Sequence, residues 1–322
     1  MGAARPGISF PAVRNREEYD ALVKSDPLFR RLAALICRQH GLSGLGLTRL
    51  SVGTSICFQV GREFVLKLFA PIFERNCEAE CAVLSYLPGK LPVAVPELVA
   101  RGSLDDWQYL LMTYLGERPL ADSWGSVSGS CKLHLFEELG RVLAVLHKHT
   151  DQCWFPLRTD WNSFLTCRAA SAVSRHRRLG LDETWVQRAE EFLGSIDLRT
   201  PGWFRPSLLH TEIMREHIIV ADVSSSPRIS GLIDFEAAMF GHPEFEFSWA
   251  GVQLTRGDKR LLGALLDGYG LPDTARDTAF RRRLMAYTLL HPYSVMKWYF
   301  DWMPVPCGVT TFEQLAELWW AA

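Results

Sequence analysis

The chain has 322 residues, of which 48% are hydrophobic and 22% are charged, so a disordered polymer is excluded and a two-lobed, enzyme-sized protein is favoured. Lys and Arg total 35 against 36 Asp and Glu, and this balance argues against nucleic-acid binding as the main task. No apolar run reaches the ~18 residues of a membrane span. The N-terminus lacks a signal-peptide core, so we expect a cytoplasmic location and reduced cysteines. No feature indicates a protein partner.

Hydrophobic periodicity divides the chain into a small mixed part and a larger helical part. The expected elements of the first part, in chain order, are a helix over 19–40, a hairpin-rich sheet over 47–69, a helix over 74–87 and a strand pair ending within 107–120. The later part is expected to contain helices over 136–149 and 183–196, a β-rich island over 210–236, and helices over 244–255, 258–269, 277–300 and 311–320. His291-Pro292 is expected to break or kink the helix over 277–300. This order predicts an α+β fold with two lobes.

Several standard signatures are missing from the sequence. There is no GxxxxGK[ST] loop, no GxGxxG loop, no GxSxG elbow and no HExxH pair. P-loop, dinucleotide-binding, α/β-hydrolase and zincin functions are therefore excluded.

A lysine and a glutamate are the first candidate pair. Lys67 lies within the strand FVLKLF, and Glu80 lies on the helix that follows. A buried Lys–Glu pair would hold an ammonium group ready for an anion such as phosphate. Taken alone, the apolar alternation around Lys67 favours a solvent-facing position for both side chains.

Two acids and two histidines lie within the β-rich island, close to the ends of its strands. His210, Glu212 and His217 precede the strand 218–220, and Asp234 directly follows the apolar strand Leu232-Ile233. Carboxylates and a histidine around a tight hairpin suit a divalent cation and the orientation of a hydroxyl nucleophile. Turn or capping roles are the alternative, although a carboxylate at a buried strand end needs a partner.

Together these segments resemble the aminoglycoside phosphotransferase family. The resemblance covers residues 47 to 250 approximately and is carried by FVLKLF, ECAVLSYLPGKLPVAVPELV (80–99), YLLMTYLGERPL (109–120), ELGRVLAVLHKH (138–149), HTEIMREH (210–217) and IDFE (233–236). It implies a protein-kinase-like fold, with a small β-rich nucleotide-binding N-lobe (1–115) and a larger helical C-lobe (116–322) that holds the catalytic loop, the metal loop and the acceptor site. The C-terminal segments RRLMAYTLLHPY and TFEQLAELWW look most like the members that act on hygromycin B.

The resemblance also implies roles for individual residues. Asp234 would hold Mg²⁺, and Glu212 would accept the proton of the acceptor hydroxyl within a catalytic loop that begins at His210. Two positions depart from the family: Glu212 stands where aspartate is usual, and His217 stands where a metal-binding asparagine is usual. The residues implied in ATP binding are Gly53, Thr54 and Ser55 around the phosphates, Lys67 and Glu80 at the α- and β-phosphates, and Thr113 to Leu115 at the adenine.

Acidic residues near the metal loop are candidates for a polycationic acceptor. Glu236, Glu244 and Glu246 follow the metal loop, and Asp301, Glu313 and Glu317 lie in the last helices, although solvated helix faces are an equal alternative for each. Trp298 and Trp302 are expected to be core residues. The resemblance implies an ATP- and Mg²⁺-dependent kinase for hygromycin B or a related aminoglycoside. A kinase for another antibiotic or metabolite, and a pseudokinase without transfer activity, are the alternatives.

Overall fold

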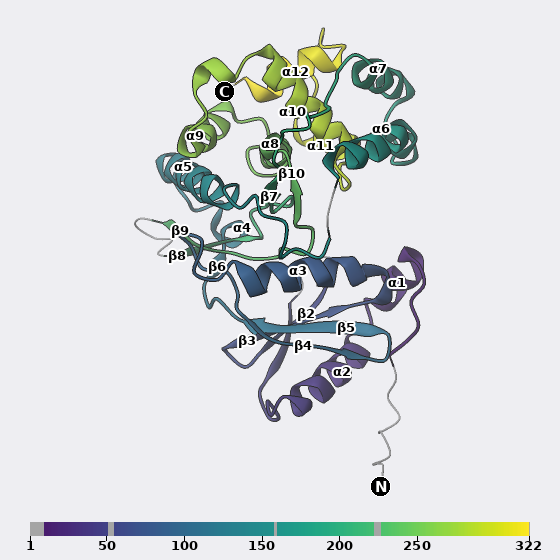
Figure 1. The fold of residues 1–322 in the computed structure, drawn as a ribbon, viewed down its shortest axis with the longest axis vertical. Coiled ribbons are helices and arrows are strands. Elements are labelled where there is room, and N and C mark those ends of the chain that lie inside the picture. The colour runs from purple at the N-terminus through teal and green to yellow at the C-terminus, as the bar shows by residue number, and fades with distance from the viewer. Residues whose placement is uncertain (1–9, 51–54, 158–159, 222–226, 322) are drawn as a thin grey trace.

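A computed structural model describes residues 10–50, 55–157, 160–221 and 227–321. Two lobes are stacked along the long axis (Figure 1): one is built on a five-stranded sheet, and the other consists mostly of helices. This is the α+β bilobal arrangement that the sequence predicts. None of the helices in the described segments is long and apolar enough to cross a membrane.

The small lobe is an antiparallel sheet in the order β1-β2-β3-β5-β4. Its strands are β1 (Leu47–Leu50), β2 (Ile56–Val60), β3 (Phe64–Phe69), β4 (Leu98–Leu104) and β5 (Trp107–Thr113). Gly61 has a φ of 61° in the tight turn between β2 and β3. Glycine adopts this backbone conformation without strain. Central β3 places Lys67 opposite Cys57 on β2 and Leu110 on β5.

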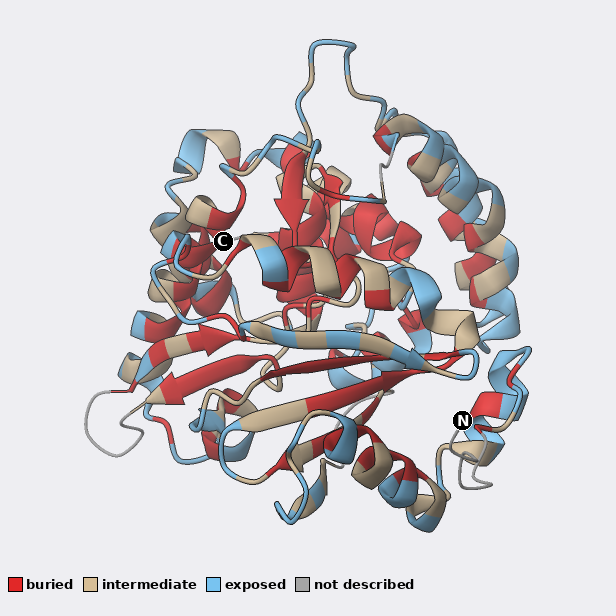
Figure 2. Cartoon of the chain, turned by 60° about the horizontal axis from the view of Figure 1, so that its bottom comes forward, coloured by how far each residue is buried: buried red, intermediate tan, exposed pale blue. Residues whose placement is uncertain are grey.

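Helices cover both faces of this sheet. The predicted helix over 19–40 is two helices, α1 (Arg16–Leu22) and α2 (Asp26–Gln39), because Pro27 fits only the first turn of a new helix. These helices pack on one face of the sheet, where Phe29 and Leu32 of α2 share a buried core with Trp107 of β5. On the other face, α3 (Glu74–Tyr86), preceded by η1 (Pro71–Phe73), lies between the sheet and the large lobe (Figure 1). Figure 2 shows that the inner strands of the sheet consist largely of buried residues, drawn in red.

The large lobe is organised around packed helices. They are α4 (Leu120–Ser123), α5 (Gly129–Leu146), α6 (Trp161–Arg178), α7 (Glu183–Gly194), α8 (Pro243–Gln253), α9 (Lys259–Tyr269), η2 (Asp273–Ala275), α10 (Thr278–Leu290), α11 (Met296–Trp302) and α12 (Phe312–Trp320). Helices α5 and α9 approach so closely that a Cβ atom on Gly140 would lie 2.0 Å from the Leu265 carbonyl oxygen. Helix α6 is not among the predicted elements. It buries only Trp161, Leu165, Ala172 and His176, so its apolar periodicity is weak.

Two small sheets position the loops that matter for chemistry. One contains β6 (Arg118–Pro119), β8 (Ile218–Ala221) and β9 (Arg228–Leu232), and the other pairs β7 (Ser207–Leu209) with β10 (Met239–Gly241). The predicted β-rich island is the hairpin β8–β9. A backbone bridge between Ala94 and Gly231 joins this hairpin to the segment between α3 and β4.

Two expectations for the C-terminal part have opposite outcomes. The break at His291-Pro292 is confirmed, because α10 ends at Leu290 and α11 begins at Met296. The prediction that Trp298 and Trp302 are core residues is wrong, since they are 55% and 36% exposed. The short helix α11 buries Met296 and Tyr299 instead.

Candidate active site

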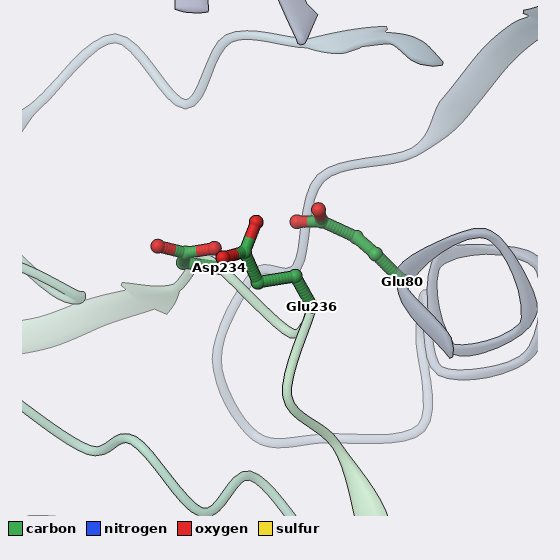
Figure 3. A group of neighbouring side chains, drawn as sticks. All are labelled: Glu80, Asp234 and Glu236. Carbon is green, nitrogen blue, oxygen red and sulfur yellow. The ribbon is translucent and has the colours of Figure 1, made fainter. Parts of the chain in front are cut away.

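Lys67 lies at the centre of a cluster of carboxylates between the lobes. Its Nζ is 2.6 Å from Glu80 Oε2, 2.6 Å from Asp234 Oδ1 and 2.8 Å from Glu236 Oε2. Figure 3 shows Glu80 reaching from α3 toward Asp234 and Glu236, which come from the loop after β9. The side chains of Lys67 and Glu80 are 5% and 2% exposed, so a solvent-facing position is wrong for both.

The cluster has more negative than positive charge. Burial alone would lower the pKa of Lys67, but Asp234, Glu236 and Glu80 together hold it well above its usual value. Burial likewise opposes ionisation of Asp234, yet Lys67 and His217 keep the pKa of this carboxyl well below its usual value. Burial raises the pKa of Glu80 to about 7. Three carboxylates facing one ammonium group create a strong demand for further positive charge.

Thr211 has a left-handed backbone in the loop 210–217, which the sequence predicts to be the catalytic loop. Its φ is 68°, a region that costs a β-branched residue roughly 1–2 kcal/mol. Three hydrogen bonds hold it there: Oγ1 donates to the Ala237 carbonyl at 2.9 Å, N–H donates to Glu246 Oε2 at 3.2 Å, and the carbonyl accepts from His291 Nε2 at 3.1 Å. The loop is therefore fixed in a conformation that its own sequence disfavours.

His210 links the catalytic loop to the strand before Asp234. Its Nε2–H donates to the Ile233 carbonyl at 2.9 Å, and its Nδ1 accepts from the Glu212 N–H at 3.3 Å. Burial lowers the pKa of His210 to about 4, so the ring is neutral at neutral pH. Since both ring nitrogens contact backbone groups, His210 positions the loop and is not placed to transfer a proton.

Glu212 and His217 are neighbours in the same loop. Burial, together with the charge of Asp234, raises the pKa of Glu212 to about 8. His217 Nδ1–H donates to the Glu212 carbonyl at 2.7 Å, and Nε2–H donates to Asp234 Oδ2 at 3.0 Å. Burial would lower the pKa of His217, but Asp234 and Glu212 together outweigh it and raise the value to about 9. Both ring nitrogens of His217 are engaged, so the predicted role as a metal ligand stays a prediction and would require Nε2 to release Asp234.

A cluster of three carboxylates provides the oxygen atoms that a hard cation prefers. Glu80, Asp234 and Glu236 each offer an oxygen, and these atoms lie within 4.8 Å of one another. Oxygen ligands and a net negative charge suit Mg²⁺. The sequence places Glu236 among the residues that bind the acceptor. In this arrangement, however, Glu236 suits a role as the second cation ligand beside Asp234 better than His217 does.

The residues predicted to bind the nucleotide are only partly brought together. Gly53 and Thr54 lie outside the described residues, whereas the Ser55 hydroxyl donates to Glu236 Oε2 at 2.6 Å. At the end of β5, the Thr113 N–H already donates to the Glu97 carbonyl at 3.0 Å. A base in the cleft would therefore have to use other main-chain groups, such as those of Leu115.

The acidic residues predicted to bind the acceptor are engaged within the protein. Glu246 is fully buried and accepts from the His210 N–H at 2.7 Å, which removes it from the acceptor set. Glu244 forms a two-point ion pair with Arg283, with N–O distances of 2.7 and 2.8 Å. The acids of the last helix, Glu313 and Glu317, pair with Arg282 and Arg281, while Asp301 on α11 is exposed.

Sequence reasoning missed His291 as part of the site. Its ring stacks on Trp249 with centroids 4.0 Å apart, and its Nε2–H donates to the Thr211 carbonyl. The only signal in the sequence was the His-Pro pair inside a predicted helix. That pair indicates a helix break, but it does not reveal that the break lies against the catalytic loop.

Comparisons with known proteins agree with this geometry. The model of the phosphotransferase enzyme family matches residues 50–282. Among solved structures, the GDP and kanamycin complex of APH(2")-IIIa is 17% identical with a TM-score of 0.66, covering 85% of this chain and 94% of that one. The streptomycin–ATP–APH(2")-IIa ternary complex is 20% identical with a TM-score of 0.58, covering 89% and 98%. The macrolide 2'-phosphotransferase MphH from Brachybacterium faecium is 20% identical with a TM-score of 0.56, covering 85% and 98%.

These structural likenesses show the fold, which is the protein-kinase-like one, and the family model spans more than two thirds of the chain. The Lys67 cluster and the catalytic loop both fall inside the matched range. The chain therefore belongs to the phosphotransferase enzyme family.

Proposed function

We propose that this phosphotransferase transfers the γ-phosphoryl group of ATP to a hydroxyl group of an aminoglycoside, with hygromycin B as the first acceptor to test. The observation that carries the proposal is the meeting of Lys67, Glu80 and Asp234 beside Glu212. The resemblance of the C-terminal helices to hygromycin B kinases supports the choice of acceptor. Residues 1–115 would form the nucleotide-binding lobe, and residues 116–322 would provide the catalytic loop and the acceptor site.

The roles of the side chains follow from their geometry. Lys67 would turn its ammonium group toward the phosphates of ATP, while Glu80 keeps it in the cleft. Asp234 and Glu236 would hold Mg²⁺, which when bound neutralises charge on the phosphates. Because the pKa of Glu212 is about 8, the group is mostly protonated at pH 7, and its ionised fraction would accept the proton of the acceptor hydroxyl. Positioning of the hydroxyl and compensation of charge would account for most of the acceleration.

The direct test is incubation of the purified protein with Mg·ATP and an aminoglycoside panel led by hygromycin B. We expect ADP release and a product that is heavier by one phosphoryl group. Glu212→Ala should lose most of the turnover while it still binds ATP, and Glu216→Ala, on the same loop, is the matched control. Unchanged turnover in Glu212→Ala would remove Glu212 from the mechanism.

One observation favours a second candidate, a nucleotide-binding pseudokinase. The His217 ring is held between the Glu212 carbonyl and Asp234, so its positive charge lies where the family places an asparagine. A protein that binds Mg·ATP but yields neither ADP nor a phosphorylated acceptor would support this candidate. ADP release without an acceptor would instead leave the phosphotransferase assignment intact and the acceptor wrong.

A further inference from the structure

Helix α6 lies beside α10 (Figure 1) and turns three polar side chains toward the end of that helix. Arg175 and His176 follow Arg168 by about two helical turns, so all three share a face with buried Ala172. Within the described segments, no carboxylate pairs with either arginine. The partners of these side chains are main-chain carbonyl groups.

The C-terminal end of α10 depends on donors from outside the helix. A helix leaves its last carbonyl groups without partners of its own. The residue after α10 is His291, which leaves the helical conformation with φ of −58° and ψ of 134°, and Pro292 has no N–H to donate. Donors from α6 bond instead to the carbonyls of residues 289–292: Arg175 to Leu289 (2.7 Å), His291 and Pro292 (2.7 Å), Arg168 to Leu290 (2.9 Å), and His176 to Leu289 (2.8 Å).

The guanidinium group of Arg175 makes most of these bonds. Burial lowers its pKa to about 10, so it remains charged at neutral pH. A positive charge is favourable at the C-terminal end of a helix, and the planar guanidinium group can donate to several carbonyls at once. Without Arg175, the carbonyls of buried Leu289 and His291 would each lose a donor, and the segment would have to shift to replace it.

The segment that Arg175 fixes supports the loop 210–217. The His291 ring stacks on Trp249 and on Phe245 of α8, with ring centroids 4.0 and 4.9 Å away. Its Nε2–H donates to the carbonyl of Thr211, the residue that precedes Glu212 in the loop. A shift of the His291 backbone would therefore be passed on to the loop.

The same segment forms a wall of the cavity between α3 and this loop. Pro292 and Tyr293 line the cavity, and the Tyr293 side chain hydrogen-bonds to Asn76 on α3. Burial and the charges of Glu212 and Glu236 raise the pKa of Tyr293 to about 12, so the phenol is protonated at neutral pH. An acceptor that reaches Glu212 would meet this wall, a step that rests on the proposed function.

We infer that Arg175 is a positioning residue for the transfer reaction and acts through the break between α10 and α11. By fixing the carbonyls of residues 289–292, it holds the His291 ring against Thr211 and keeps Tyr293 at the cavity wall. Helix α6 thereby takes part in the arrangement of the site, although its arginines touch only the back of the segment that faces it.

Hydrogen–deuterium exchange of the full chain tests this link without an acceptor. The amides of His210 and Thr211 donate to Glu246, so exchange in peptides over 210–217 reports on the loop. Arg175→Met should speed exchange there by at least about fivefold, while peptides from β3 keep the wild-type rate. Arg175→Lys keeps the charge but lacks the planar fork, and it should fall between the two. Arg178→Met, at the exposed end of α6, is the matched control.

Two exchange patterns would overturn the inference. Faster exchange confined to α6 and α10 would make Arg175 a helix cap and nothing more. Uniformly faster exchange in all peptides would show a loss of global stability without a specific effect on the loop. If Arg175→Met fails to fold, the same criteria apply to Arg175→Lys.

Steady-state kinetics gives a second test once an acceptor is phosphorylated. Arg175→Met should raise the KM of the acceptor by at least about fivefold, while the KM of ATP stays within about twofold of the wild type. The effect should shrink in a Tyr293→Ala background, where the wall is already lost. A fall in kcat with both KM values unchanged would indicate less active protein and would overturn the inference. A protein that phosphorylates no aminoglycoside but shows the exchange effect would refute the proposed acceptor and leave the link between Arg175 and the loop standing.

Discussion

The ammonium nitrogen of Lys67 lies 2.6 Å from Asp234 Oδ1, although 167 residues separate the two in the chain. This contact joins the sheet of the small lobe to the loop after β9 in the large lobe. It also means that the lysine serves as a counter-ion for carboxylates that are otherwise suited to a metal ion. Removing either partner therefore affects the folding of the protein as well as its chemistry.

Lys67→Met should destabilise the protein by about 3 kcal/mol, because it leaves three buried carboxylates without their cation. Millimolar Mg²⁺ should raise the thermal midpoint of this variant more than that of the wild type, since the cation replaces the missing charge. Thermal unfolding with and without Mg²⁺ measures both effects. Exposed Lys148→Met is the control, and a variant that is indifferent to Mg²⁺ would contradict the cation site.

Glu246→Gln should lower kcat by at least about tenfold with little change in the KM of the acceptor. The reason is that Glu246 holds the His210 and Thr211 amides and does not reach the cleft. Steady-state kinetics with a phosphorylated acceptor separates the two constants. A selective rise in KM would restore the acceptor role that the sequence suggested.

Thr211→Ala and Thr211→Gly should differ in stability. Alanine loses the hydrogen bond to the Ala237 carbonyl and keeps the backbone strain, so we expect a loss of about 1–2 kcal/mol. Glycine loses the same bond but relieves the strain, and it should remain within about 1 kcal/mol of the wild type. Urea unfolding of both variants provides the comparison, and glycine being the less stable would argue against strain at this position.

The buried histidines His176 and His291 should each contribute a loss of stability as the pH decreases from 7.5 to 5.5, opposite in sign to the contribution of Glu212, whose pKa is raised. Burial lowers the pKa of His176 to about 4 and of His291 to about 3, so only the unfolded chain takes up these protons between pH 6.5 and 4. Each histidine thus contributes stability that is complete above pH 6.5 and is lost below it, on the order of 1 kcal/mol over this interval. His176→Phe should therefore lose less stability, or gain more, than exposed His134→Gln when the pH is lowered from 7.5 to 5.5. A profile that stays unchanged in His176→Phe would rule out this source of acid sensitivity.

Gly140→Ala should cost about 2–3 kcal/mol, since its Cβ would lie 2.0 Å from the backbone oxygen of Leu265 and would push α5 away from α9. Gly129→Ala, at the start of α5, meets nothing within 4 Å and should change stability by less than about 1 kcal/mol. Chemical denaturation of the pair tests the close approach of the two helices. Equal stability of both variants would show that α5 and α9 can separate without cost.

The sequence predicted the roles of residues that lie in segments shared with the family better than the roles of residues whose partners are set by tertiary packing. Lys67, Glu80 and Asp234 stand in segments with a recognisable order, and the structure brings them into contact. Glu246 could not be assigned in this way, because an acid in a first helical turn looks solvent-exposed until the catalytic loop folds over it. Local pattern reveals a helix, but it does not show which distant loop the helix supports.

The position of α3 has a consequence for how the protein unfolds. Its side chains Cys77, Val83 and Leu84 belong to one continuous core that also includes Leu110 and Met112 of the sheet and the helices of the large lobe. Because this core runs through both lobes, we expect the chain to unfold as one cooperative unit. Amide protons of α3 should then exchange only through global unfolding, although the cleft lies directly beside them.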